Sequence, residues 1–287
     1  MKTVAVHNGK FHADDVFSIA ILRKIYPELE VIRTRDPEKL ASVDARVDVG
    51  MKYNPETLDF DHHQSESAGE RENGISYASV GLIWKHFGME LVNSLQAWTA
   101  IDESLIQPLD ADDCGISTYE TTKGVSPYTI PKIIARMNPN WKEDASSDQQ
   151  FEKSVAFATL ILERELLTAN NQAAADQIIL EALEKRTDKR YLILETYCPY
   201  KKLIKDYPEL LYVIFQGTGQ WCINAVEEKE FVSKKLFPKS WWGLEKEELR
   251  NISGIETADF CHKTGFFFAC QTKEDALLAV EKSLEQD

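Results

Sequence analysis

The first 115 or so residues alternate short apolar runs with amphipathic ones, and this alternation constrains the fold more than any other feature of the chain. The apolar periodicity predicts four strands, at 3–7, 29–34, 45–49 and 57–61. It predicts helices at 14–26, from 35 onward with Pro37 in the first turn, and at 76–87. Strands that alternate with helices form βαβ units and a mostly parallel sheet, whose ligands bind beyond the carboxyl ends of the strands.

The rest of the chain has two different patterns. Residues 120–187 are predicted to be helical, with a loop at 137–141 and a long amphipathic run from Phe151. From Tyr191 short strands dominate, and a helix at 273–284 follows them. We therefore expect an α/β domain at 1–120, a helical connector at 121–188 and a smaller α+β domain at 189–287.

Composition limits the class of protein. Of 287 residues, 43% are hydrophobic and 28% are charged, as in soluble globular proteins. No apolar run approaches the roughly 20 residues that span a bilayer, and no signal-peptide pattern follows Met1, so we expect a cytoplasmic protein without membrane association. The five cysteines are scattered without a Cys-x-x-Cys pair, which favours free, largely buried thiols.

The formal net charge of −14 restricts the ligands. Proteins that hold nucleic acid by broad phosphate neutralisation are usually basic. A phosphate ligand of this chain must therefore be attracted by bound metal and by a local basic patch.

Histidines and aspartates crowd the end of the first predicted strand: His7, His12, Asp14 and Asp15. Imidazoles and carboxylates together suit a divalent metal such as manganese, iron or zinc. The alternative is that Asp14 caps the following helix and both histidines are ordinary surface residues.

Two further strand ends carry the same residue types. Asp48 lies between two valines before Gly50, where a turn-forming role is the alternative. Asp61, His62 and His63 follow the fourth strand, where a turn of the backbone can bring both imidazoles to one cleft. We expect His62 to bind a metal, His63 to reach a substrate phosphate and Asp61 to orient an imidazole.

A fourth acidic spot, Asp110-Ala111-Asp112-Asp113, follows a helical region. Three carboxylates in four residues repel one another unless a cation lies nearby. A metal pair would relieve this repulsion, and so would solvation on a loop.

Basic and glycine residues offer candidate phosphate contacts. Arg33, Arg35 and Lys39 form a clamp or, alternatively, ion pairs with Asp36 and Glu38. In the third region, His262 and Gly265 form the best local candidate, because glycine lets backbone approach a phosphate closely. Stacking of Trp221, Trp241 and Trp242 on nucleic acid bases is conceivable, but packing in the core is the more frequent role of tryptophan.

The ordered motifs resemble those of the DHH phosphoesterase superfamily. More closely, nearly the whole chain resembles the melanocyte-proliferating-gene-one family, long labelled metal-dependent protein hydrolases, of which at least one eukaryotic member is described as a 3′-to-5′ RNA exonuclease. The stretches that carry this resemblance are His7-Asn8-Gly9-x-Phe11-His12, 33–40 (Arg-Thr-Arg-Asp-Pro-Glu-Lys-Leu), 47–50 (Val-Asp-Val-Gly), 60–64 (ending His-His-Gln), Asn138-Pro139-x-Trp141 and Ser253-Gly254-Ile255. His12 stands where superfamily relatives usually carry aspartate.

The resemblance implies two divalent metal ions, manganese first and magnesium as the alternative. It implies Asp48 as the bridging carboxylate and His63 as a donor to the phosphoryl oxygen. The implied ligands are His7, His12, Asp14, Asp48, His62 and Asp110; Asp113 also fits the fourth motif, and we choose Asp110.

With this resemblance we predict a two-metal phosphodiesterase that acts on short single-stranded RNA, and the resemblance implies a 3′–5′ exonuclease. The alternatives are a hydrolase of pyrophosphate or a nucleoside bisphosphate, which the acidic charge suits, a protein hydrolase, and an inactive metal-binding scaffold. The oligomeric state, including a homo-oligomer, stays open.

Overall fold

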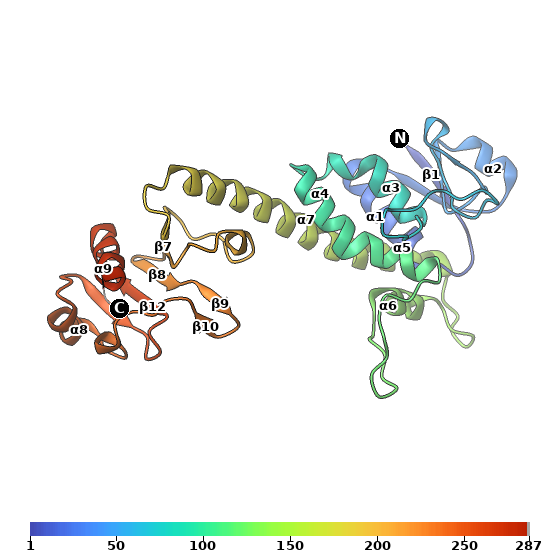
Figure 1. The fold of residues 1–287 in the computed structure, drawn as a ribbon. Helices are drawn as coiled ribbons and strands as arrows, with labels where there is room; N and C mark the ends of the chain where they lie inside the picture. The colour runs from blue at the N-terminus through green and yellow to red at the C-terminus, as the bar shows by residue number, and fades with distance from the viewer. Residues whose placement is uncertain (286–287) are drawn as a thin grey trace. The chain divides into compact units, whose positions relative to one another are not determined.

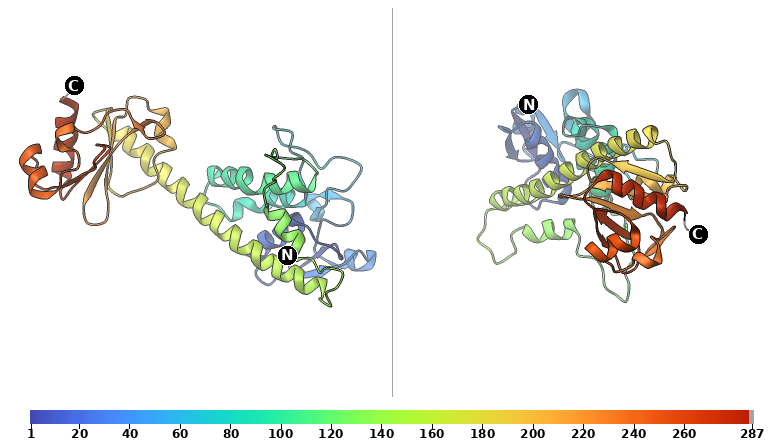
Figure 2. Two further views of the ribbon diagram at one scale, coloured as in Figure 1. Left: turned by 90° about the horizontal axis from the view of Figure 1, so that it is seen from below. Right: turned by 90° about the vertical axis from the view of Figure 1, so that its left-hand side faces the viewer.

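The computed structural model describes residues 1–285, which form two compact units, the first Met1–Ala173 and the second from Ala174 onward. The boundary falls within the long helix α7 (Ser147–Lys185), which runs without interruption in Figure 2. The helical segment that we expected to be a separate connector is therefore divided between the units.

The first unit contains a five-stranded sheet, of which Figure 1 labels β1. Its order is β2-β1-β3-β5-β4, and all neighbours are parallel except β4, which pairs antiparallel with β5 at one edge. The strands are β1 (Thr3–Val6), β2 (Glu30–Arg33), β3 (Ala45–Val47), β4 (Tyr53–Asn54) and β5 (Asp59–Phe60). The predicted α/β class with a mostly parallel sheet is confirmed.

Apolar side chains cover the two faces of this sheet differently. On one face Val4, Val6 and Val47 belong to the main core, which also contains the apolar side chains of α1 and α3. On the other face Ala5 packs with Val43 and Val49 near α2. The helices of this unit before α7 are α1 (Ala13–Ile25), α2 (Pro37–Ser42), α3 (Ser79–Phe87), α4 (Leu95–Ile101), α5 (Gln107–Asp113) and α6 (Ile130–Met137), with short turns η1 (Pro55–Thr57), η2 (Gly88–Glu90) and η3 (Asp102–Ile106).

One part of the predicted helical segment is a loop. Residues 115–129 form no helix, and α6 begins only at Ile130. Gly115 and Gly124 adopt positive φ angles of 71° and 75°, which are incompatible with a right-handed helix. The predicted loop after Met137 is confirmed, because Asn138 ends α6 in an extended conformation.

The second unit has its own sheet, in the order β11-β12-β8-β7-β6. β6 and β7 are parallel, and the other pairs are antiparallel. The short strands expected after Tyr191 are present in this sheet: β6 (Tyr191–Leu194), β7 (Tyr212–Gln216), β8 (Trp221–Ala225), β11 (Ala258–Cys261) and β12 (Phe267–Cys270). The predicted last helix is α9 (Lys273–Glu285), while α8 (Lys246–Ser253), β9 (Glu227–Lys229), β10 (Val232–Ser233), η4 (Leu203–Asp206) and η5 (Lys239–Trp241) were not predicted.

Tryptophan and cysteine side chains are buried in the second unit. Trp221 and Trp241 are buried there, so packing is their role in this fold. All five cysteines are free, and all but Cys114 are buried, as predicted. Within residues 1–285, no helix is long and apolar enough to cross a membrane.

Candidate metal centre

Parallel pairing brings three acidic and histidine-containing segments to one edge of the first sheet. β1, β3 and β5 run in the same direction, so their carboxyl ends meet. His7 follows β1, Asp48 follows β3, and His62 lies two residues after β5. Segments as much as 55 positions apart in the chain (62 minus 7) therefore converge.

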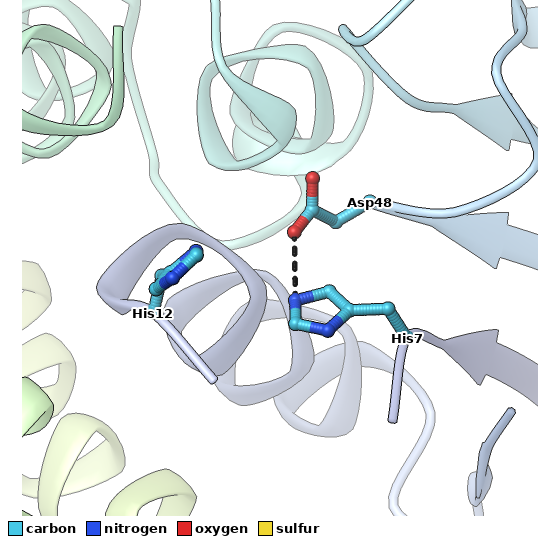
Figure 3. Close-up of side chains that lie close together, drawn as sticks. All are labelled: His7, His12 and Asp48. Atoms are coloured by element: carbon cyan, nitrogen blue, oxygen red, sulfur yellow. Dashed lines mark ion pairs between the residues drawn. The ribbon is translucent and has the colours of Figure 1, made fainter. Parts of the chain in front are cut away.

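His7 is buried between two carboxylates. Its Nε2 lies 3.2 Å from Asp15 Oδ2 and 3.1 Å from Asp48 Oδ2. Figure 3 shows the His7 ring and the Asp48 carboxylate pointing toward each other. Burial alone would lower the pKa of His7, but the two carboxylates outweigh it and raise the pKa to about 10. The two carboxylates therefore strongly favour positive charge at this position.

Asp48 is the most connected side chain of the group. Its Oδ1 accepts a hydrogen bond from Ser79 Oγ at 3.1 Å and lies 3.5 Å from His62 Nε2 and 3.4 Å from His63 Nδ1. Asp48 has a φ angle of 54°, in the left-handed region that few non-glycine residues adopt. The sharp turn aims its carboxylate between the imidazoles. Burial would raise the pKa of Asp48, but His62 and His7 lower it.

Asp14 is a buried carboxylate without a hydrogen bond. It is fully buried, and neither oxygen accepts a hydrogen bond from the described residues. The Nε2 atom of His62 is 4.0 Å from its Oδ2. Burial and the carboxylates of Asp48 and Asp113 raise the pKa of Asp14 well above its usual value. An unpaired buried carboxylate is costly unless a cation binds it, so this residue fits a metal ligand.

The start of α1 positions His12. The backbone N–H of His12 donates to Asp15 Oδ1 at 3.0 Å, so Asp15 caps the helix and leaves Asp14 facing the histidines. The His12 side chain is 57% exposed, and its Nδ1 lies 3.6 Å from Asp113 Oδ1. His12 is thus the accessible imidazole of the first motif.

The fourth motif contributes Asp113 to this group and not Asp110. Asp113 Oδ2 is 3.0 Å from His62 Nε2. Asp110 instead accepts hydrogen bonds from Arg71 Nη1 at 2.7 Å and from the backbone N–H of Gly81 at 2.9 Å. A Cβ at Gly81 would lie 2.0 Å from the Asp110 carboxylate, so only glycine permits this approach. The structure does not bring the predicted ligand Asp110 to the centre, because its carboxylate is saturated by these donors.

His63 lies at the rim of the group. Its Nδ1 is 2.8 Å from Asp61 Oδ1, and its side chain is 52% exposed. Asp61 also accepts the backbone N–H of Met51 at 2.6 Å, which fixes the carboxylate. Asp61 therefore orients the His63 imidazole, as the sequence predicted for this aspartate.

Together these side chains form three groups. Within each group the potential ligand atoms lie within 4.8 Å of one another. They are His7, His12 and Asp48; Asp48, His62 and His63; and His12, Asp14 and Asp113. Mixed imidazole and carboxylate donors suit manganese and related divalent ions. The donor set and the unpaired Asp14 carboxylate both fit a bound metal.

The two arginines predicted to clamp a phosphate form bonds to other groups of the protein. Arg33 Nη2 donates to the Gly9 carbonyl at 2.8 Å, its Nη1 lies 2.8 Å from Asp148 Oδ1, and the guanidinium lies 4.7 Å from the Phe151 ring centroid. Arg35 donates to the Asn8 carbonyl. These arginines hold the loop between His7 and His12.

His262 and Gly265 lie in the second unit. His262 Nδ1 is 2.9 Å from Thr264 Oγ1 in an exposed turn. Gly265 has a φ of 70°, and a Cβ there would meet Trp242 Nε1 at 2.1 Å. The turn and its packing on Trp242 explain this glycine.

Sequence reasoning missed the contacts of two residues. Asp15 was named only with the first motif, and Ser79 was not singled out. The capping pattern His12-x-x-Asp15 was a readable signal for Asp15. No sequence signal indicated Ser79, which reaches Asp48 only through packing of α3.

The fold and the site define an α/β protein with a candidate divalent-metal centre at the carboxyl edge of a parallel sheet. Residues 3–284 match the family model MYG1_exonuc, described as "Uncharacterised protein family (UPF0160)". The chain belongs to this MYG1 family, which confirms the expected family.

Relatives from distant eukaryotes match over nearly the whole chain. The "MYG1 protein" of Dictyostelium discoideum is 32% identical, covering 99% of this chain and 97% of its own. The "MYG1 exonuclease" of Homo sapiens is 32% identical, and the match covers 99% of this chain and 86% of the human protein. The "MYG1 exonuclease" of Bos taurus is 32% identical, and the match covers 99% of this chain and 84% of the bovine protein.

Among solved structures, RecJ of Thermus thermophilus in complex with Mn²⁺ matches with a TM-score of 0.30 and 14% identity, over 100% of this chain and 52% of RecJ. The chain thus spans about half the length of that protein. A similarity this weak does not transfer site geometry.

Proposed function

We propose that this protein is a metal-dependent exonuclease that removes nucleotides from the 3′ end of RNA or short oligonucleotides. The observation that carries the proposal is the Asp48 carboxylate, which belongs to two of the three candidate ligand groups. A carboxylate shared in this way suits a bridge between two cations. The relatives named exonuclease support the reaction class.

The residues that would hold the ions are His7, His12, Asp14, Asp48, His62 and, in place of the predicted Asp110, Asp113. When bound, two divalent ions would stabilise charge on the phosphate and make a water molecule more acidic. Manganese is our first choice, because imidazole ligands disfavour magnesium.

Other residues act on the substrate directly. The exposed His63 imidazole, oriented by Asp61, would donate a hydrogen bond to a phosphoryl oxygen and stabilise the charge that grows there. Asp61 would keep the donating nitrogen of His63 facing outward. We assign substrate binding to the second unit as well, with His262 and Gly265 as candidates. The cytoplasmic location remains a prediction.

The test is cleavage of single-stranded RNA labelled at its 5′ end, with Mn²⁺ or Mg²⁺. We expect a ladder of products shortened from the 3′ end. Asp48→Asn should reduce the rate more than about a hundredfold, since loss of a residue that only orients a metal ligand already costs roughly 10–100-fold. The matched control Asp144→Asn alters an exposed carboxylate of the same unit and should cleave normally.

Two outcomes would contradict the proposal. If the wild type cleaves pyrophosphate and not RNA, the protein is a hydrolase of small phosphate compounds. If Asp48→Asn cleaves RNA like the wild type, the reaction does not use this centre.

A further inference from the structure

A pocket within the first unit is lined by the neighbour in sequence of a proposed metal ligand. It has a volume of about 330 Å³ and is formed by η3, α5, the loop after α5 and the start of α6. Asp112 lines it, and the next residue, Asp113, has its carboxylate near His62 and His12. The pocket therefore begins one residue away from a proposed metal ligand.

The lining favours an uncharged ligand with a flat apolar body. Its apolar wall includes Leu105, Leu109 and Ile130. None of the described residues that line it is lysine, arginine or histidine, so the pocket does not suit a phosphate. Asp112 lines it as well and is exposed. Its carboxylate is available to accept a hydrogen bond from a polar edge of a ligand.

We propose that this pocket binds the nucleobase of the nucleotide whose phosphodiester is cut. The inference rests on the proposed function, because it takes the neighbouring centre as the place of phosphodiester cleavage. A volume of about 330 Å³ is at the lower end for small-molecule sites, which suits one ring system with its sugar. The apolar walls cover the faces of the base, and the Asp112 carboxylate meets its polar edge.

The experiment measures binding of free nucleosides to the metal-free protein by ligand-observed NMR. Adenosine and uridine carry no phosphate, so their binding does not need the metal centre. Thr118→Trp places a bulky ring in the pocket lining and should weaken binding at least tenfold. The control Val125→Trp adds the same ring to the same loop at a residue that is 71% exposed and outside the lining. It should bind like the wild type.

A second variant tests the polar contact without filling the pocket. Asp112→Ala removes the carboxylate and adds no bulk, and we expect about a fivefold loss of nucleoside affinity. If the wild type binds neither nucleoside, or if Thr118→Trp binds both as well as Val125→Trp does, the pocket proposal is overturned.

A cleavage assay separates this proposal from the proposed function. RNA with a normal 3′-terminal base is compared with RNA whose last nucleotide lacks its base. We expect Thr118→Trp to slow cleavage of the normal end at least tenfold and to leave the end without a base unchanged. If nucleosides bind and no RNA is cut, the exonuclease proposal fails while the pocket stands. If Thr118→Trp cuts both ends at the wild-type rate, the pocket proposal fails alone.

Discussion

The side-chain amide of Asn138 bonds both backbone groups of Phe11: Nδ2 donates to the Phe11 carbonyl at 2.8 Å, and the Phe11 N–H donates to Oδ1 at 2.9 Å. Phe11 directly precedes His12, the N-cap residue of α1. The Asn138-Pro139-x-Trp141 motif thus supplies a clamp on the loop that carries His7 and His12.

Asn138→Ala should therefore weaken metal binding. Loss of a residue that orients a ligand typically costs roughly 10–100-fold in metal affinity, and we expect a loss of this size for Mn²⁺. Titration calorimetry with Mn²⁺ measures it. Asn140→Ala, two positions away, removes only local bonds to its own turn and should bind Mn²⁺ normally. Equal affinities of the two variants would show that the clamp does not position the ligands.

Asp14→Asn should have opposite effects on the metal-free and the metal-bound protein. The unpaired buried carboxylate destabilises the metal-free fold, so its neutralisation should raise the free energy of unfolding by on the order of 1–2 kcal/mol. The same change should remove the stabilisation that Mn²⁺ confers. Thermal unfolding with EDTA and with excess Mn²⁺ measures both effects, and Asp144→Asn is the control. A variant that Mn²⁺ still stabilises fully would exclude Asp14 as a ligand.

Metal affinity should rise with pH between 6 and 8. The pKa of His7 is raised to about 10 in the metal-free protein, so the imidazole is protonated throughout this range. A metal can bind only the neutral imidazole, and binding must therefore release that proton. Each released proton makes the affinity rise about tenfold per pH unit.

Calorimetry in two buffers of different ionisation enthalpy counts these protons. His62, whose pKa is also raised, should release a second one. His7→Gln should release one proton fewer than the wild type. An affinity that is constant from pH 6 to 8 would contradict the proposed ligands.

The two candidate aspartates of α5 should behave differently when changed. Asp113→Asn should lose Mn²⁺ binding with little change in stability. Asp110→Asn should lower the free energy of unfolding by about 3 kcal/mol, since breaking a buried ion pair leaves Arg71 without one of its partners. Thermal unfolding and Mn²⁺ titration of both variants measure this difference. If Asp110→Asn folds normally and fails to bind metal, the sequence-based choice of Asp110 was right.

The strand-end positions of the site were predictable from the sequence. Apolar alternation located β1, β3 and β5, and a parallel sheet places their carboxyl ends together. This rule places His7, Asp48 and His62 at one edge of the sheet, while their roles as ligands came from the family resemblance.

Side-chain partners from distant segments were not predictable. Asp110 and Asp113 lie one helical turn apart, and only the docking of Arg71 and the close approach of Gly81 distinguish them. The sequence also suggested Arg33 as part of a phosphate clamp. Its bond to the Gly9 carbonyl depends on tertiary packing, so the sequence could not show that the guanidinium is used there. The left-handed turn at Asp48 had a local signal, since aspartate tolerates this conformation better than most residues, but the sequence did not show which partners its carboxylate would meet.

The central claim is that these side chains hold two cations that share Asp48. Anomalous diffraction from crystals grown with Mn²⁺ tests it most directly. The account predicts two peaks about 3.5–4 Å apart, with an oxygen of Asp48 next to each of them. A single peak, or two peaks that Asp48 does not touch, would contradict it.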